Sequence, residues 1–190
     1  VLGKVEKDSG QYDTPADVLW VTGACLAVRA SVWNSLEGLD DRFFAHMEEI
    51  DLCWRMQLEG WKVTVVPEST VYHLGGGTLP KNSPQKLYLN YRNNILLLDN
   101  NLARTIGRRK AALRVFCRKI LDGCSAMVYL LSFRMDFFMA VWRAHRDASR
   151  LIAEKQPGND AAHGHGRHNV AGLYDGCMIP RALLGIKCIK

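Results

Sequence analysis

The chain has 190 residues, of which 48% are hydrophobic and 23% charged, and its formal net charge at pH 7 is +6. This composition is typical of a folded protein and excludes wholesale disorder, and the length suffices for one core with an appendage. The charge is uneven, because residues 104 to 150 contain eleven Lys and Arg against three Asp. So basic a segment favours an anionic partner, such as phospholipid head groups, nucleotide phosphates or nucleic acid.

The cysteines and the apolar runs indicate the compartment. The six cysteines form no C-x-x-C pair and no regular framework, which favours a reducing, cytosolic environment. Cys25 and Cys53 lie in apolar runs, so we expect both to be buried. The longest apolar run, "CSAMVYLLSF", is far shorter than the roughly 20 residues of a membrane span. The chain opens at Val1 inside what reads as a continuing segment, so we expect an N-terminal part to be missing.

The first sixty residues predict short strands and helices. Residues 17–30, "DVLWVTGACLAVRA", favour a strand, a turn and a second strand. The segment "SVWNSLEG" predicts a short helix with Ser31 as its N-cap and Gly38 as its end. Over residues 48–59 apolar side chains recur at helical spacing, and Gly60 is expected to end this helix.

The remaining chain predicts a change from mixed to helical structure. "KVTVV" and "STVYHL" favour two further strands, followed by the flexible "GGGT". "SPQKLYLNYRNNILLLDNN" predicts a helix with Ser83 as N-cap and Pro84 in its first turn. Residues 105–155 combine helix formers with basic and bulky apolar residues, which predicts one or two amphipathic helices, and residues 156–190 predict a loop and a tail.

The stretch "FFAHMEEIDLCWRM" crowds three carboxylates, Glu48, Glu49 and Asp51, among large apolar side chains. Like charges at this spacing repel one another, and burying any of them costs free energy unless a partner compensates. Two interpretations follow from the residues alone. The acids form either a solvated first helical turn, where the macrodipole favours negative charge, or part of a functional site.

Several segments, in this order and spacing, resemble the C-terminal half of a family 2 glycosyltransferase with a GT-A fold, of the bacterial rhamnosyltransferase-like type. They are "VTGACLAVRASVW", "LEGLDDRFFAHMEEIDLCWRMQLEGWKVTVVPESTVYHLGGGT" and "YLNYRNN", between about Trp20 and Asn101. The resemblance implies an α/β chain. Residues 1–104 would be the acceptor-side half of a Rossmann-like αβα domain that lacks its nucleotide-binding half, 105–155 a basic amphipathic helical extension, and 156–190 a loop and tail.

The resemblance also implies an activity. Such enzymes transfer a sugar from a nucleoside-diphosphate sugar to a saccharide or lipid-linked saccharide with inversion, in surface polysaccharide biosynthesis. The donor that the resemblance favours is dTDP-rhamnose, and UDP- and GDP-sugars are the less favoured alternatives. The location implied is the cytoplasm, at the inner face of the cell membrane.

A hydroxyl that attacks the sugar must lose its proton, so a carboxylate is needed within hydrogen-bond reach. The family places an acidic pair, usually Glu-Asp, at the start of this helix, and its second acid is the base. The pair here is Glu48-Glu49, which implies Glu49 as the base. Because Glu replaces Asp, a share of this role for Glu48 or Asp51 stays open.

The resemblance marks further residues on the acceptor side and at the metal. Thr22, Gly23 and Ala24 match the segment that lines the acceptor side of the cleft, although a tight crossing of strands would require the same small residues. His73 is implied as a ligand of the divalent metal, Mn²⁺ or Mg²⁺, that holds the diphosphate. The alternative is an ordinary packed or surface histidine.

Two further matches concern phosphate. The glycine run that begins with Gly75 and Gly76 would let backbone N–H groups approach a phosphate, and a plain hinge is the alternative. Arg92 with Asn93 matches an "RN" of the family. Arg92 would reach a diphosphate or an acceptor phosphate, or else form a structural salt bridge with the acidic helix.

The family's nucleotide-binding half carries an Asp-x-Asp sequence, and none occurs in these 190 residues. We therefore expect the donor site to lie outside the chain, and expect the chain alone not to turn over a nucleotide sugar. An alternative function is a non-catalytic peripheral module that binds an anionic membrane through residues 105–155. Nucleic-acid binding is disfavoured, because no recognition motif accompanies the charge. The apolar side of the membrane segment would contain Leu130, Phe137, Phe138 and Trp142.

Overall fold

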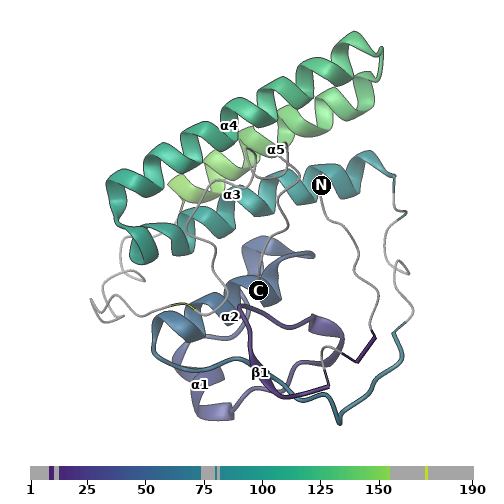
Figure 1. Ribbon diagram of the computed structural model, residues 1–190. Helices are drawn as coiled ribbons and strands as arrows, with labels where there is room; N and C mark the ends of the chain where they lie inside the picture. The colour runs from purple at the N-terminus through teal and green to yellow at the C-terminus, as the bar shows by residue number, and fades with distance from the viewer. Residues whose placement is uncertain (1–8, 11–12, 74–79, 81, 155–169, 171–190) are drawn as a thin grey trace.

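The computed structural model describes residues 9–10, 13–73, 80, 82–154 and 170, and these form two layers (Figure 1). One layer consists of the three long helices α3, α4 and α5, and the other contains α1, α2 and the short strands. None of the helices in these described ranges is long and apolar enough to cross a membrane. In chain order the elements are β1 (Ala16–Asp17), a 3-10 turn (Gly23–Cys25), α1 (Ala30–Ser35), a second 3-10 turn (Asp41–Phe43), α2 (Glu48–Leu58), β2 (Thr64–Val65), α3 (Pro84–Ile106), α4 (Arg108–Leu131) and α5 (Met135–Ala153).

The two strands form one antiparallel pair of two residues each. Of the strand, turn and strand predicted over residues 17–30, the central turn is confirmed as a 3-10 turn, whereas the two strands are wrong except at Asp17. The side-chain amide of Gln57 competes with strand pairing in this segment. It donates to the carbonyls of Val18 and Leu19, at 3.0 and 2.8 Å. These carbonyls are thereby taken from any ladder that a neighbouring strand would form.

The predicted Rossmann-like layering is not seen in the described residues, which are mostly helical. Of "KVTVV" only Thr64 and Val65 pair as a strand, and residues 69–73 form none. Short apolar segments need neighbouring strands to become stable sheet, and the described part of the chain supplies only one pair. Apart from Val170, the predicted loop and tail at 156–190 lie outside the described residues.

The ends of the two short helices follow the chain's glycines. α1 begins one residue before the predicted cap Ser31, without a side-chain cap. As predicted, Gly38 terminates this helix: its φ is +68°, and its N–H donates to the Trp33 carbonyl at 2.9 Å. A Cβ on Gly38 would lie 2.8 Å from the Trp33 ring, so both conformation and space require glycine there. α2 covers the predicted range and ends before Gly60, which has φ +83°.

α3 is the central helix of the molecule. Its predicted start is confirmed, since the Ser83 side chain accepts from the Lys86 N–H at 3.2 Å and Pro84 is the first helical residue. It continues past the predicted end at Asn101 to Ile106. Because α2 covers one side of α3 while α4 and α5 cover the other, its buried residues are not confined to one stripe. They are Leu89, Asn93, Ile95, Leu96, Leu97, Asn101 and Leu102.

The core has two parts that meet at α2. The upper cluster joins the two layers and contains Phe43, Trp54, Leu58, Leu96, Leu97, Leu102 and Ala111. The lower cluster lies between α1, α2 and β2 and contains Val32, Leu36, Leu52, Cys53, Met56 and Val63. Cys53 is buried as predicted, whereas Cys25 is exposed on its 3-10 turn. The four cysteines that the structure describes are free thiols.

The helices predicted for residues 105–155 are present as α4 and α5, separated by Ser132, Phe133 and Arg134. The predicted apolar face needs correction. Phe137 is 7% exposed and points into the helical layer, where its ring lies 5.3 Å from that of Tyr129. Trp142 is 63% exposed, as the predicted face requires.

Candidate active site

The acidic stretch follows a loop with a strained backbone. Phe44, His46 and Met47 have φ of 62°, 70° and 75°, although none is glycine. Met47 is the N-cap of α2 and provides no side-chain cap, so α2 opens directly with Glu48 and Glu49. Left-handed conformations of such residues cost about 1–3 kcal/mol each and persist only where the surroundings hold them. The loop 43–47 must therefore be held from outside.

Arg92 and Asn93, on the facing side of α3, hold this loop. The amide of the fully buried Asn93 donates to the carbonyls of Phe43, Ala45 and His46, at 3.0, 2.7 and 2.7 Å. Nη2 of Arg92 donates to the Arg42 and Phe43 carbonyls at 3.1 and 2.7 Å. Among the described residues, Arg92 thus contacts backbone carbonyls, Asn93 and Tyr88, rather than the carboxylates of the acidic helix.

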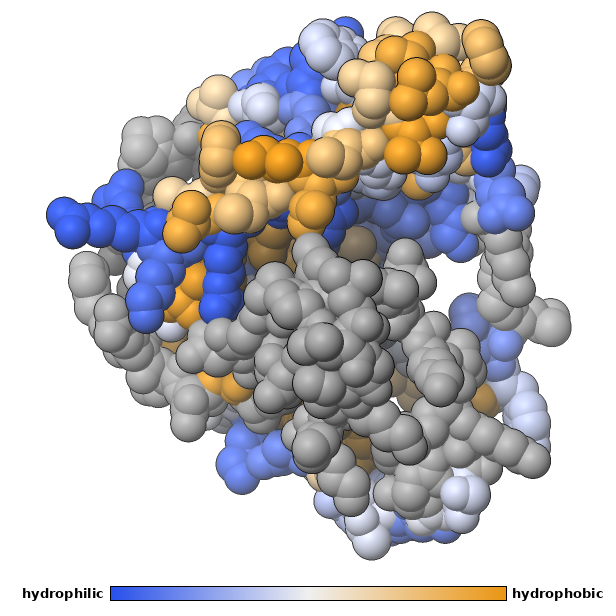
Figure 2. Space-filling model, turned by 45° about the horizontal axis from the view of Figure 1, so that its top comes forward, coloured by the Kyte–Doolittle hydropathy of each residue, from blue (hydrophilic) through white to orange (hydrophobic). Residues whose placement is uncertain are grey.

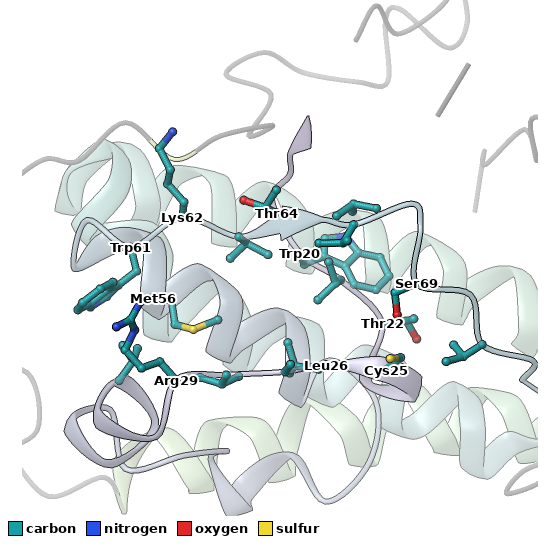
Figure 3. A pocket seen from close by; sticks show the side chains of 18 residues that line it. Trp20, Thr22, Cys25, Leu26, Arg29, Met56, Trp61, Lys62, Thr64 and Ser69 are labelled. Atoms are coloured by element: carbon teal, nitrogen blue, oxygen red, sulfur yellow. The ribbon is translucent and has the colours of Figure 1, made fainter. Parts of the chain in front are cut away.

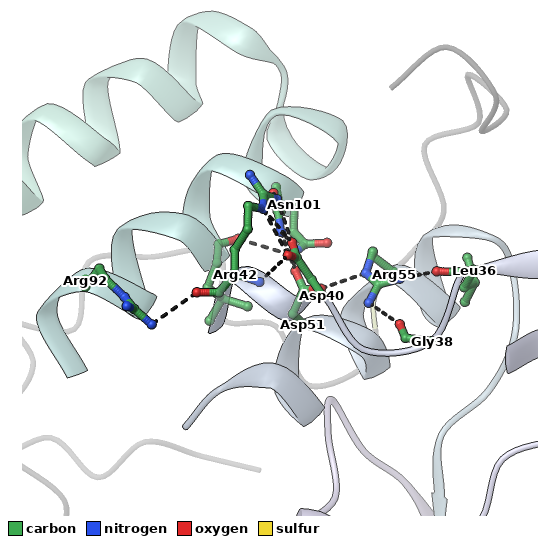
Figure 4. Close-up of polar contacts among 10 residues, drawn as sticks. Leu36, Gly38, Asp40, Arg42, Asp51, Arg55, Arg92 and Asn101 are labelled. Atoms are coloured by element: carbon green, nitrogen blue, oxygen red, sulfur yellow. Dashed lines mark hydrogen bonds and ion pairs between the residues drawn. The ribbon is translucent and has the colours of Figure 1, made fainter. Parts of the chain in front are cut away.

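Asp51 has a different environment from its two acidic neighbours. It is 0% exposed and accepts from Arg55 Nε at 2.7 Å, the (i, i+4) pair expected on this helix. Its other oxygen accepts from the amides of Asn100 and Asn101, at 3.0 and 2.7 Å. Figure 4 shows this network, in which Arg55 continues to the carbonyls of Leu36 and Gly38. These contacts use the carboxylate to fix the segment that leads into α2.

A second ion pair fixes the same segment nearby. Arg42 binds both oxygens of Asp40, with a shortest distance of 2.6 Å, and its Nη2 also donates to Asn100 at 2.8 Å. Burial by itself would raise the pKa of the Asp40 carboxyl. The hydrogen bonds and charge of Arg42, with the Asn100 amide, outweigh burial, so the pKa of Asp40 lies below its usual value.

Glu48 and Glu49 are half-buried and lack such partners. Each has one carboxylate oxygen, Oε2, that is closed to solvent and has no hydrogen-bond partner within the described residues, and the same holds for Nε2 of His46. Buried polar atoms without partners are uncommon and mark sites where a ligand or an ordered water completes the bonding. The start of α2 therefore offers unused carboxylate acceptors, and His46, two residues before it, has an unused ring nitrogen.

The structure brings the predicted small residues to Glu49. A Cβ built on Gly23 would lie 3.7 to 3.8 Å from Cβ, Cγ and Cδ of Glu49, so the turn of Thr22, Gly23 and Ala24 packs on this side chain. Cys53, one helical turn further, shares this side of α2. Burial raises the pKa of the Cys53 thiol, and the Glu49 carboxylate adds to the rise against a backbone hydrogen bond from Val21.

A groove of about 810 Å³ begins at the same turn. Figure 3 shows Thr22, Cys25 and Ser69 together at one end, and Arg29, Trp61 and Lys62 at the other. Between these ends the lining is mostly valine, leucine and methionine. Binding a sugar requires several converging polar groups, and polar side chains stand at both ends of the groove. The end at Thr22 is the one that begins at the turn packed on Glu49.

The predicted metal ligand His73 stays a prediction. His73 is exposed, and in the described ranges no three His, Cys, Asp or Glu side chains are arranged to hold a metal ion. These residues thus do not form a metal centre by themselves. Gly75 and Gly76 lie outside the described residues.

Sequence reasoning missed His46, Asn100 and Asn101. His46 immediately precedes the acids in "FFAHMEE", and this adjacency could have drawn attention to it. The two asparagines gave no signal, because their partner Asp51 is about fifty positions away in the sequence and meets them only through the packing of α2 on α3.

Comparisons with known proteins find similarity in the region that contains the acidic helix. Residues 4–93 match the family described as glycosyltransferase like family 2. The chain is 41% identical over 54 residues to the N-acetylglucosaminyl-diphospho-decaprenol L-rhamnosyltransferase of Mycobacterium tuberculosis strains CDC 1551 and H37Rv. It is 36% identical over 70 residues to rhamnosyltransferase WbbL of Escherichia coli K12. No solved structure is significantly similar to it.

These matches are partial. The mycobacterial match covers 28% of this chain and 18% of the relative, and the Escherichia coli match covers 37% and 26%. The chain thus corresponds to about a fifth to a quarter of the curated relatives it matches. The matched family region includes the turn at Gly23, the acidic start of α2 and the Arg92–Asn93 pair that holds the loop. Residues 4–93 are therefore similar to family 2 glycosyltransferases, and the relatives that the chain matches are named as bacterial rhamnosyltransferases.

Proposed function

We propose that the chain is the acceptor-side half of an inverting glycosyltransferase and that Glu49 is its general base. The observation that carries the proposal is the environment of Glu49. Its side chain is half-buried, has one oxygen without a partner among the residues that the structure describes, and packs on the small-residue turn at Gly23. Asp51 is committed to Arg55, Asn100 and Asn101, which favours a positioning role for it and leaves Glu48 and Glu49 as the available acids. Glu49 is favoured over Glu48 because its side chain packs on Gly23.

The proposed reaction is a single displacement. The oxygen of an acceptor hydroxyl attacks the anomeric carbon of the donor sugar, the bond from that carbon to the diphosphate oxygen breaks, and the nucleoside diphosphate departs with the bonding electrons. The hydroxyl proton passes to Glu49. In this scheme Arg92 and Asn93 position Glu49 through the loop 43–47, and Thr22, Gly23 and Ala24 border the acceptor.

The substrates are proposed at the level that the relatives support. The donor is a nucleoside-diphosphate sugar, with rhamnose favoured by the names of the relatives. The mycobacterial relative is named for a lipid-linked saccharide, which supports an acceptor of that class in cell-envelope polysaccharide assembly. A divalent metal would need ligands beyond those described, with His73 as one contributor, so no step is assigned to it. The predicted cytoplasmic location stays a prediction.

The test is the variant Glu49→Gln in the full-length enzyme. It keeps the shape of the side chain and removes its basicity, so kcat should fall by about 10²–10⁴-fold with donor affinity unchanged. Transfer of radiolabelled sugar to a polyprenyl-diphosphate-linked acceptor measures kcat, and calorimetry with the nucleoside diphosphate measures donor binding. Glu48→Gln is the matched control, for which kcat should stay within about tenfold of wild type. Turnover that survives Glu49→Gln would remove Glu49 from the role of base.

A related proposal concerns the chain alone. Because it lacks an Asp-x-Asp sequence, we propose that residues 1–190 by themselves do not transfer sugar. Product formation by this chain from dTDP-rhamnose, a UDP-sugar or a GDP-sugar would contradict that proposal without affecting the role of Glu49.

A further inference from the structure

The outer surface of the α4–α5 hairpin exposes an unusual number of large apolar side chains. On α4, Leu113, Phe116, Ile120, Met127 and Leu131 are between 51% and 72% exposed. Their spacings of three, four and seven residues place them on one side of the helix. The opposite side contains the buried Ala111, Asp122 and Ala126, which face the rest of the helical layer.

The turn between the helices and the start of α5 extend this surface. Phe133 is 92% exposed, Met135 52% and Trp142 63%. Figure 2 shows apolar side chains gathered on the side of the molecule that bears α4 and α5, with charged side chains beside them. Monomeric soluble proteins seldom expose so large a continuous apolar surface without a partner for it. We call these eight residues, five on α4 and three beyond it, the hairpin surface.

The charges around the hairpin surface are almost all positive. Residues 108–153, all of them described, contain ten Lys and Arg against three Asp. Asp122 is buried beside Arg118, and Asp147 accepts from Tyr88 and Arg146, which leaves Asp136 as the exposed acid of this range. The exposed cations are Arg108, Arg109, Lys110, Lys119, Arg134, Arg143, Arg146 and Arg150.

We propose that the hairpin surface docks on the surface of an anionic phospholipid bilayer. The apolar side chains would enter the boundary between head groups and acyl chains, and the flanking Lys and Arg would meet lipid phosphates. Trp142 suits this boundary, because its ring is apolar while its N–H remains able to donate. A second copy of the chain fits less well, since a two-fold contact would bring cationic rims together. The inference is independent of the proposed sugar transfer.

Vesicle co-sedimentation of the 190-residue chain tests the proposal. The chain should bind vesicles of phosphatidylglycerol and phosphatidylcholine, bind pure phosphatidylcholine weakly, and lose affinity as salt is raised. The double variant Leu131→Gln, Phe133→Asn should bind anionic vesicles about tenfold more weakly or worse. Asn suits residue 133 because its φ is +56°. Arg109→Gln with Lys119→Gln should weaken binding by a similar factor.

The matched control changes exposed apolar residues in the other layer. Val66 and Tyr72 are 55% and 100% exposed, and Val66→Gln with Tyr72→Gln should bind vesicles as wild type does. Circular dichroism checks that each variant keeps its helices. The proposal is overturned if the chain does not bind anionic vesicles, or if the hairpin variants bind undiminished. A dimer in analytical ultracentrifugation that the same variants dissociate, without vesicle binding, would assign the hairpin surface to a second copy. Glu49→Gln should bind like wild type, which separates this test from that of the base.

Discussion

Glu49 and Asp51 lie two residues apart on one helix and have opposite environments. Asp51 is closed to solvent and accepts three side-chain hydrogen bonds, whereas Glu49 has an oxygen with no partner in the described part of the chain. Burying a carboxylate costs desolvation free energy unless partners compensate for it. Arg55 and the two asparagines provide this compensation for Asp51. The crowding of acids in this stretch is therefore resolved because Asp51 has a structural role while the half-buried Glu49 stays available for a ligand.

This division predicts different consequences for stability. Asp51→Ala should lower the free energy of unfolding by about 3–5 kcal/mol, because it leaves Arg55 and two amides unpaired in the interior. Glu49→Gln should change it by less than about 0.5 kcal/mol. Urea denaturation followed by tryptophan fluorescence measures both. Equal losses in the two variants would contradict the assignment of Asp51 as the structural acid.

Asp40 predicts a dependence of stability on pH. Its pKa is lower in the folded protein than in the unfolded chain, where it is near 3.8, so its contribution is complete above that value. The contribution is lost as pH falls through the folded pKa. Asp40→Asn should therefore cost about 2 kcal/mol at pH 7, and its difference from wild type should shrink as pH falls below 3.8. Urea denaturation across this pH range checks it, and a constant difference would count against the ion pair with Arg42.

At the scale of elements, the contact of α3 with the loop 43–47 positions the start of α2. The two amide N–H groups of Asn93 are shared among three loop carbonyls, and Arg92 donates to the carbonyls of Phe43 in the loop and of Arg42 just before it. Without them, the left-handed residues Phe44, His46 and Met47 would relax to ordinary conformations. The geometry at Glu49 thus depends on a residue of another helix.

Asn93→Ala should destabilise the protein by about 1–3 kcal/mol, since buried carbonyls lose their donor. In the full-length enzyme it should also lower kcat more than it changes KM for the donor, because the base is misplaced while donor contacts remain. Steady-state kinetics with varied donor concentration separates the two parameters. Ser83→Ala, which removes the cap of the same helix at about 1 kcal/mol, is the control that should leave kcat unchanged. A matching loss of kcat in both variants would reduce Asn93 to a general stabiliser.

At the scale of the whole molecule, the two layers are joined through the upper cluster. Leu96 on α3 is 0% exposed in this cluster, with Phe43, Trp54 and Leu58 from the other layer. The hairpin surface contributes nothing comparable to folding, since Leu113 is 62% exposed. Leucine is thus part of the core at position 96 and part of the outer surface at position 113.

The contrast gives a matched pair of variants. Leu96→Ala should lower the free energy of unfolding by about 2–5 kcal/mol, as for other fully buried leucines. Leu113→Ala should change it by less than about 0.5 kcal/mol. Thermal unfolding followed by circular dichroism and by tryptophan fluorescence should give coincident transitions for both variants. Separate transitions of the two signals would show that the layers unfold independently.

The helices were predictable because their signals are local. Ser83 with Pro84, and the glycines at 38 and 60, set helix ends through capping and left-handed backbone, which depend on neighbours in the chain. The predicted strands failed because a strand is completed by partners elsewhere, and Gln57 occupies carbonyls that 18–19 would have offered. The direction of Phe137 likewise depended on where α3 lies.

For the candidate site, the sequence by itself determined that Glu48, Glu49 and Asp51 share the opening of one helix and that Thr22, Gly23 and Ala24 form a small-residue segment. Only the tertiary structure decided which acid is buried, which one meets Gly23, and that Arg92 and Asn93 hold the preceding loop. The physical reason is the sequence separation over which each interaction acts. Helical periodicity and capping act over a few residues, whereas desolvation and the pairing of a carboxylate depend on groups about fifty positions away that only packing brings together.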